Sequence, residues 1–430
     1  MKQYESYKDS GVQWIGQIPS HWQMTKSKHI FSLITDNVCD KSLPKVALEN
    51  IESGTGKYIE TSSDFMGEGI EFQVNDILFG KLRPYLAKVY KADFRGQSVG
   101  DIYVFRPKEN QDAGFLKYLM LSRPFISVVD GSTYGAKMPR ANWDFISQML
   151  LPTPNLDEQR IIASYLDHKV GQIDAVIVEK EAMVSDLTAY RSAVISEAVT
   201  RGLDKSAPLR DSGIDWIGKI PKHWQVVNLK RVSKIQTGNT PSTSIEKYWS
   251  NPTEDWFTPS DFDEMNIRLS HSARKLNECA FDEMACRVFN PGTVLVVGIG
   301  ATLGKVGLVL SRCSSNQQIN AVEFFEIINP LYGAYYLSSK TEVMKAQANS
   351  STLPILTQTA MGELMFVLPP IEEQDQIVSH IESFTASITT TLAELQAEIA
   401  DLQSYKSAII TEAVTGKVDL RDWKPKTVTA

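Results

Sequence analysis

The sequence predicts an α+β protein in which two mixed α/β domains are separated by a long antiparallel two-helix coiled coil, with an internal pseudo-twofold repeat. Two observations support this fold class. A long helical segment occurs twice, at Asp157–Thr200 and Glu372–Thr415, and an opening block occurs twice, at Asp9–Gln23 and Asp211–Gln225. Each unit therefore consists of an opening block, a mixed region and a long helix.

The two helical segments share a heptad pattern. Their final phrases, YRSAVISEAVT from Tyr190 and YKSAIITEAVT from Tyr405, are identical at eight of eleven positions. Apolar residues recur at spacings of four and three, which indicates a coiled-coil seam. The first seam contains Leu166, Val170, Ile173, Ile177, Val184, Leu187, Val194 and Ala198, and the second contains Ile381, Ile388, Leu392, Leu395, Ile399, Leu402, Ile409 and Ala413. Neither segment contains proline, so each is predicted to form one helix of about 65 Å.

The opening blocks match at eleven of fifteen positions, and the repeat is more than 200 residues long. A period of that length indicates a duplicated pair of domains. Trp14, Ile18, Pro19 and Trp22 have the character of a packing plug, in which His21 and its counterpart His223 are expected to be structural.

The mixed regions read as short strands and one helix each. In the first region, strands are predicted at Gln73–Gly80, Ala87–Ala92 and Ile102–Arg106, and a further strand runs into Leu151–Pro154. In the second region, strands are predicted at Thr293–Val297, Val306–Leu310 and Ala321–Ile327, and a further strand ends at Leu368–Pro370. Helices are predicted at Ala113–Leu121, stopped near Pro124, and at Pro330–Ser338. If the long helices pair along their seams, the second must return toward the first domain, so the last residues are expected near the first.

Composition limits the class of protein. The 430 residues, 43% hydrophobic and 22% charged, are enough for two to four globular domains. The polar N-terminus excludes a signal peptide, and no apolar run reaches membrane-spanning length. Four cysteines (Cys39, Cys279, Cys286 and Cys313) without a CxxC pair and six histidines without HExxH spacing give no metal site and fit a reducing cytoplasm.

Charge is unevenly distributed despite the net value of −7. Residues 346–405 carry eight acidic side chains and no Lys or Arg, whereas Lys81–Lys108 contains seven basic and two acidic ones. A local basic stretch suits a surface that faces DNA. Loop residues are the candidates for DNA contact, because Arg reads guanine, Lys contacts phosphate and amides read adenine. They are Lys81, Arg83, Lys88, Lys137 and Arg140 in the first unit, and Lys305, Gln317 and Asn320 in the second.

The glycine-rich stretch Val294–Lys305 offers a different function, nucleotide binding. Its spacing is GxGxxxG, Val306 follows the lysine where a phosphate-binding loop needs Ser or Thr, and a strand is predicted next. A phosphate site needs a helix N-terminus there, so a glycine-rich strand connection is favoured. No paired carboxylates or Ser/His/Asp order points to a catalytic residue.

The sequence resembles a known family, the specificity subunits of type I restriction-modification systems. The resemblance covers essentially the whole length. It rests on both DSGxxWIGxIPxHW blocks, Thr237–Ser242 (TGNTPS), Gly298–Lys305, Asn316–Asn320, the Glu-Gln pairs at Glu158 and Glu373, and the SAxIxEAVT helix ends. The first unit lacks the TGxTP phrase and the glycine-rich turn.

The resemblance implies a DNA-binding subunit of a host-defence system. This subunit would have no catalytic activity of its own. Residues 1–155 and 206–370 would be target recognition domains that each read half of a split DNA sequence, with Thr237 among the contacts. Residues 156–205 and 371–420 would be conserved spacer helices, which dock two methyltransferase subunits through Tyr190, Glu197, Tyr405 and Glu412. Restriction subunits would join them, and S-adenosylmethionine, ATP and Mg would be bound by these partners. The alternative is a coiled-coil scaffold that binds only proteins.

Overall fold

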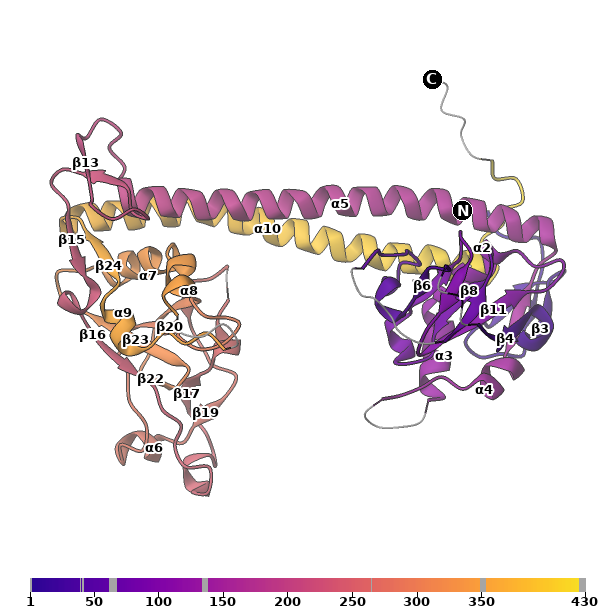
Figure 1. The fold of residues 1–430 in the computed structure, drawn as a ribbon, viewed down its shortest axis with the longest axis horizontal. Coiled ribbons are helices and arrows are strands. Elements are labelled where there is room, and N and C mark those ends of the chain that lie inside the picture. The colour runs from indigo at the N-terminus through magenta and orange to yellow at the C-terminus, as the bar shows by residue number, and fades with distance from the viewer. Residues whose placement is uncertain are drawn as a thin grey trace. The chain divides into compact units, whose positions relative to one another are not determined.

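The computed structural model describes residues 2–38, 40, 42–61, 68–133, 138–263, 265–348 and 353–424. It divides into two compact units (Figure 1). Unit 1 contains Met1–Glu181 and Ala397–Ala430, and unit 2 contains Ala182–Gln396. Both long helices contribute to both units, and each unit is described below by itself.

Unit 1 is built around two four-stranded sheets. The first has the antiparallel order β4 (Phe31–Ile34), β11 (Ile102–Pro107), β8 (Ile77–Gly80) and β9 (Val89–Lys91). The second has the order β5 (Asn37–Val38), β7 (Gly69–Phe72), β10 (Gly96–Ser98) and β6 (Lys45–Val46). Two pairs complete the strands, β1 (Tyr7–Asp9) with β2 (Gln17–Pro19) and β3 (Gln23–Lys26) with β12 (Leu150–Thr153). The short helices are α1 (Ser27–Ile30), η1 (Leu48–Asn50), η2 (Pro84–Leu86), α2 (Ala113–Leu121), α3 (Arg123–Gly131) and α4 (Trp143–Gln148).

The helix α2 has the predicted bounds, but its surroundings differ from the prediction in two places. Pro124 lies in the first turn of α3 instead of only ending α2, because proline is well tolerated where a helix begins. The predicted strand Gln73–Gly80 begins only at Ile77. Before it, the Asp76 carboxylate accepts a hydrogen bond from the Gln73 amide, and Asn75 has a positive φ of 73°, so this segment is a turn.

Unit 2 has a five-stranded sheet and a three-stranded one. The larger has the order β16 (Ser233–Thr237), β23 (Ile319–Phe324), β20 (Val294–Val297), β21 (Val306–Val309) and β18 (Arg268–Leu269), and the smaller has the order β19 (Lys275–Leu276), β17 (Glu254–Phe257) and β22 (Cys313–Ser315). The pairs are β13 (Leu209–Asp211) with β14 (Lys219–Pro221) and β15 (Gln225–Asn228) with β24 (Met365–Leu368). The short helices are η3 (Leu229–Arg231), η4 (Glu246–Tyr248), η5 (Pro259–Asp261), α6 (Glu278–Asp282), α7 (Pro330–Ser338), α8 (Thr341–Gln347) and α9 (Gln358–Gly362).

The predicted core strands of unit 2 are present as β20, β21, β23 and β24, and α7 has its predicted bounds. β23 ends at Phe324 instead of Ile327. The Ile328 amide donates to the Phe325 carbonyl, so the chain turns there toward α7. The Asn329 side chain caps α7 by accepting from the backbone of Leu331 and Tyr332, which is the usual role of asparagine at a helix start.

The two long helices are α5 (Leu156–Arg201) and α10 (Ile371–Val414). Within unit 1 they run antiparallel, because Asp174 of α5 pairs with Lys406 of α10, and Lys180 pairs with Glu398. Ile173, Ile177 and Ile409 form a buried cluster between them. The supercoiling of a coiled coil and the pseudo-twofold repeat remain predictions.

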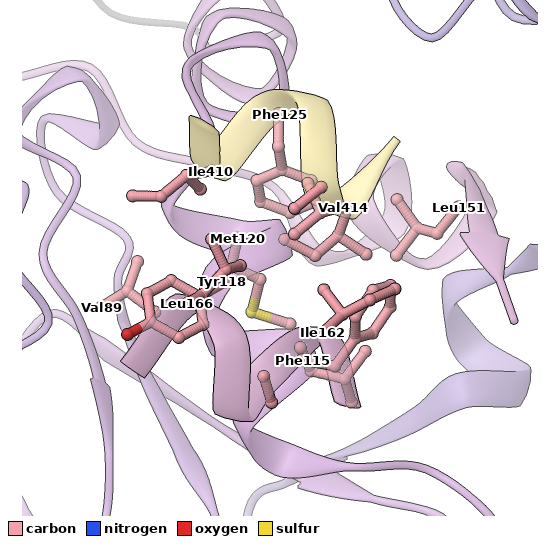
Figure 2. Close-up of a cluster of buried hydrophobic side chains, with 14 of the residues drawn as sticks. Val89, Phe115, Tyr118, Met120, Phe125, Leu151, Ile162, Leu166, Ile410 and Val414 are labelled. Carbon is pink, nitrogen blue, oxygen red and sulfur yellow. The ribbon is translucent and has the colours of Figure 1, made fainter. Parts of the chain in front are cut away.

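The helices are also part of each unit's core. In unit 1, Ile162 and Leu166 of α5 and Ile410 and Val414 of α10 pack with α2 and α3 around Met120 (Figure 2). In unit 2, residues of both helices join a separate core, which contains Ile195, Ala198, Val199, Ile377, Val378 and Ile381. A helix that buries its apolar stripe in this way is stabilised mainly by tertiary packing.

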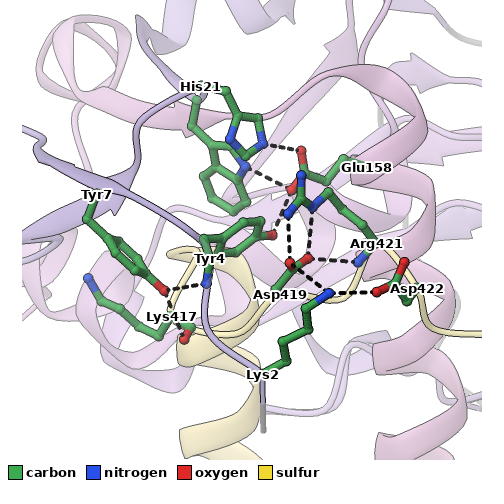
Figure 3. Close-up of polar contacts among 10 residues, drawn as sticks. Lys2, Tyr4, Tyr7, His21, Glu158, Lys417, Asp419, Arg421 and Asp422 are labelled. Atoms are coloured by element: carbon green, nitrogen blue, oxygen red, sulfur yellow. Dashed lines mark hydrogen bonds and ion pairs between the residues drawn. The ribbon is translucent and has the colours of Figure 1, made fainter.

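The opening blocks are packing elements, as predicted. Trp22 is fully buried, and its indole donates to the Glu158 carboxylate at 3.0 Å. Tyr4 donates to the same carboxylate, and His21 pairs with it at 3.0 Å (Figure 3). No helix in the described part of the chain is long and apolar enough to cross a membrane.

Candidate nucleic-acid interface

The turn between β8 and β9 holds most of the basic candidates of unit 1. It closes on a hydrogen bond of 2.8 Å from the Gly80 amide to the Lys88 carbonyl. The segment that ends at Ala141 lies against it: Arg83 donates to the Pro139 carbonyl at 2.8 Å, and Ala141 donates to the Lys81 carbonyl at 2.8 Å. These backbone bonds place two loops that are distant in sequence on one surface.

The turn between β20 and β21 in unit 2 has the same hydrogen bonds. Val297 donates to the Lys305 carbonyl at 2.9 Å, and Gly300 donates to the Pro354 carbonyl at 3.1 Å. Leu356 donates to the Gly298 carbonyl at 2.7 Å. Each residue corresponds to one in the β8–β9 turn, so that Gly300 corresponds to Arg83, Gly304 to Ala87 and Lys305 to Lys88.

Unit 1 lacks the glycine-rich sequence of this turn, as expected, but its β8–β9 turn has the corresponding backbone hydrogen bonds. Gly300 and Gly304 have φ values of 99° and 91°, and their counterparts Arg83 and Ala87 have φ values of 52° and 47°. Non-glycine residues seldom adopt such values. The two turns thus share a conformation that only one of them encodes with glycine.

Charges are arranged unevenly on the unit 1 surface. Asp101 pairs with Arg140 at 3.0 Å and with Lys81 at 3.7 Å. Arg83 is exposed, and no carboxylate among the described residues forms a salt bridge with it. Tyr85 and Met138 are 53% and 56% exposed on the same pair of loops. Sequence reasoning missed these two, and only their position beside the basic residues marks them.

The remaining unit 1 candidates differ in their surroundings. Lys88 lies under the turn, and its ammonium donates to the carbonyls of Leu48 at 2.6 Å and Ile51 at 2.9 Å. Those bonds hold the turn on η1, a structural role that the sequence did not reveal. Lys137 lies outside the described residues.

The amide candidates of unit 2 are bound within the protein. Asn320 is 3% exposed; it accepts from Thr237 at 2.8 Å and donates to the Leu356 carbonyl at 2.9 Å. Such burial argues against the predicted contact of Asn320 with a base and gives Thr237 a partner inside the fold. Gln317 is exposed and accepts from Thr240 at 2.6 Å.

The glycine turn of unit 2 is tightly packed on this amide. A Cβ atom on Gly298 would come within 2.7 Å of the Asn320 amide nitrogen, which explains the glycine there. The turn leads from β20 directly into the antiparallel β21. A phosphate site of the dinucleotide type needs a helix N-terminus at this place, so the turn serves as a strand connection, as predicted.

A cleft of about 450 Å³ adjoins this turn. Thr258, Arg274, Gly300, Thr302, Asn316 and Gln318 are among its lining residues. The Arg274 guanidinium lies over the rings of Trp249 and Trp256, at 5.2 and 4.8 Å from their centroids. Hydroxyl, amide and guanidinium groups that converge on a concave surface are suited to base edges. Arg274 was not predicted, because no motif surrounds it in the sequence.

The four residues predicted to bind partner subunits are exposed on the long helices. Tyr190 and Glu197 lie on α5, and Tyr405 and Glu412 lie on α10. Tyr190 also makes an edge-to-face contact with Phe384 at 5.5 Å. Their role in binding stays a prediction.

Comparison with known proteins shows similarity to one family. A family profile described as Type I restriction modification DNA specificity domain matches residues 221–400. The chain is 21% identical over 441 residues to the type I restriction enzyme StySPI specificity subunit of Salmonella potsdam, covering 94% of this chain and 90% of that one. The chain thus has a type I restriction modification DNA specificity domain at residues 221–400 and, over nearly its whole length, is similar to specificity subunits of type I restriction enzymes.

Two further similarities cover different shares of the chain. The MjaIX specificity subunit of Methanocaldococcus jannaschii is 32% identical over 171 residues, but the match spans only 39% of either chain. A chain from a solved structure, described as the structural basis underlying complex assembly and conformational transition of the type I R-M system, superposes with a TM-score of 0.70. It covers 93% of this chain and 99% of that one at 19% identity, which shows that the fold is shared.

Proposed function

We propose that this chain is the DNA-sequence specificity subunit of a type I restriction-modification complex and that it recognises a bipartite target. The observation that carries the proposal is the pair of turns with one backbone and different side chains, in a chain with a DNA specificity domain at residues 221–400. A common frame with different exposed groups suits two readers of different sequences.

We assign a role to each part of the chain from the order of its elements. Residues 1–155 and 206–370 are the two target recognition domains, and residues 156–205 and 371–420 form the spacer. The 46 residues of α5 correspond to about 70 Å of helix. A rigid helix between two readers fixes the gap between half-sites, as dimer geometry does in other DNA-binding proteins.

The helices also present the surface for protein partners. Residues 346–405 carry eight acidic side chains and no Lys or Arg, a charge that would repel DNA and suits a protein surface instead. Two methyltransferase subunits dock there in this proposal, with Tyr190, Glu197, Tyr405 and Glu412 among the contacts. These subunits, and the restriction subunits that join them, bind S-adenosylmethionine, ATP and Mg. This chain supplies recognition and leaves the chemistry to its partners.

A methylation map tests the function. The chain is co-expressed with its cognate methyltransferase subunit, and host DNA is sequenced by a method that detects modified bases directly. We expect a two-part motif with a fixed gap and a methylated adenine in each half. If the two proteins co-purify but no motif is methylated, the chain is either a scaffold that binds only proteins or an inactive specificity subunit.

A length variant tests the spacer. Inserting seven residues, two helical turns, into both α5 and α10 keeps each seam in register. We expect the same two half-sites separated by a longer gap. An unchanged gap in a folded, active variant contradicts the spacer role.

A further inference from the structure

The β8–β9 turn of unit 1 contains two residues in the left-handed region of backbone conformation. Arg83 has φ 52° and ψ 64°, and Ala87 has φ 47° and ψ 46°. An L residue is strained there because its Cβ atom approaches the carbonyl oxygen. Outside glycine, such residues concentrate at functional sites, where the fold overrides the strain.

The second turn shows that the strain is avoidable. At the corresponding positions it has Gly300 and Gly304, which adopt positive φ without a steric penalty. Arg83 therefore occupies a position for which glycine is the residue that the backbone favours. The side chain, and not the turn, must account for arginine there.

The fold itself makes little use of this side chain. Arg83 is exposed, and among the described residues its guanidinium takes part in no salt bridge or side-chain hydrogen bond. Its neighbours differ, since Lys81 and Arg140 both pair with Asp101. The backbone amide of Arg83 donates a hydrogen bond to the Pro139 carbonyl. The backbone is therefore fixed where it carries this charged, exposed side chain.

We infer that Arg83 is a specificity-determining residue of unit 1 that reads a guanine in its half-site; the inference rests on the function proposed above. Guanidinium donates two parallel hydrogen bonds to O6 and N7 of guanine, which no other base accepts in that pattern. Gly300 has no side chain to make this contact, so the two half-sites differ at the base that this position faces.

Three variants separate reading from structure. Arg83→Gly removes the side chain and relieves the strain. Ala87→Gly relieves the same kind of strain in the same turn and is the matched control. Arg83→Lys keeps the charge but loses the two-pronged geometry. Because relief of strain and the extra freedom of glycine in the unfolded chain oppose each other, both glycine variants are expected to melt within about 2 °C of the wild type.

The readout is the methylation map of each variant, co-expressed with the methyltransferase subunit. With Arg83→Gly and Arg83→Lys, the preference for guanine at one position of one half-site should fall by about 5- to 150-fold. The other half-site and the gap should stay the same, and Ala87→Gly should give the wild-type motif.

Three results overturn the inference. An unchanged motif with Arg83→Gly, while the wild type methylates a bipartite site, rejects Arg83 and leaves the proposed function standing. An equal loss of methylation at all sites makes Arg83 a phosphate contact. A wild type that methylates no bipartite motif rejects the proposed function and the inference together.

Discussion

At the scale of single residues, a carboxylate at the start of each long helix binds the opening block of its unit. Glu158 is 3% exposed and binds Tyr4, Trp22 and His21 in unit 1. Glu373 binds Trp224 at 2.9 Å and His223 at 2.7 Å in unit 2, but its side chain is 36% exposed. The same sequence motif thus gives the same hydrogen bonds in two different degrees of burial.

Replacing these carboxylates should cost different amounts. Glu158→Ala leaves the Tyr4 and Trp22 donors buried without an acceptor, which is expected to lower the free energy of unfolding by about 2–4 kcal/mol. Glu373→Ala admits water to its donors, and the expected loss is about 1–2 kcal/mol. Hydrogen exchange in urea, followed in peptides of each unit, measures both. Equal losses would show that burial does not govern the cost.

At the scale of elements, Asp174 joins three segments of unit 1. Its carboxylate pairs with Lys406 of α10 at 2.8 Å and with Lys57, from the segment after η1, at 2.9 Å. Burial by itself raises the pKa of Asp174, but the hydrogen bonds and charges of Lys406 and Lys57 outweigh burial and hold that pKa below its usual value of 3.8. The helix pair is therefore fixed to its own globular domain by charge as well as by packing.

This lowered pKa predicts a pH dependence. A carboxyl group whose pKa is lower in the folded state stabilises that state fully above the unfolded value, near 4, and the contribution is lost as the pH falls through the folded-state pKa. Asp174→Asn should therefore lower the free energy of unfolding of unit 1 by about 1–3 kcal/mol at pH 7, with the difference from wild type shrinking below about pH 4. Urea titrations at several pH values measure this.

Glu179→Gln is the matched control for that experiment, because Glu179 is exposed on the same helix within unit 1. A surface change of this kind is expected to alter stability by less than about 0.5 kcal/mol. If Asp174→Asn behaves like Glu179→Gln at pH 7, the pairing with Lys406 and Lys57 contributes nothing measurable.

At the scale of the whole molecule, both ends of the described chain lie in unit 1. Lys2 pairs with Asp422 at 2.8 Å, and the Asp419 amide donates to the Lys2 carbonyl at 2.9 Å (Figure 3). Lys417 donates to the Ile15 carbonyl at 2.9 Å. Trp423 packs on Tyr165, with 5.6 Å between the centroids of the two rings. The sequence prediction that the last residues lie near the first is confirmed for residues 2–424.

The closeness of the ends predicts tolerance of circular permutation. A short Gly/Ser linker from Lys424 to Lys2, with new ends between Lys205 and Pro208, cuts an exposed connection of unit 2. We expect a folded protein with the wild-type methylation motif, checked by circular dichroism and a methylation map. A cut inside α2, whose residues are largely buried, should prevent folding. Failure of every permutant cut at Lys205–Pro208 would contradict this chain organisation.

The sequence by itself determined the elements whose signals are local. The long helices follow from an apolar repeat without proline, and α2 and α7 follow from the helical runs Ala113–Leu121 and Pro330–Ser338. The two opening blocks were identified as packing elements because their tryptophans recur with their neighbours. Each of these signals lies within one stretch of chain, where periodicity and capping chemistry act.

Only the tertiary structure decided the roles of the individual candidate residues. The left-handed conformation of Arg83 depends on the hydrogen bond from its backbone amide to the Pro139 carbonyl. The inward position of Asn320 depends on its hydrogen bond to the Leu356 carbonyl. The position of Lys88 depends on its hydrogen bonds to two carbonyls of another segment. The sequence marked all three as polar loop residues. Burial and φ at such positions are set by contacts between residues far apart in the chain, and no local pattern encodes those contacts.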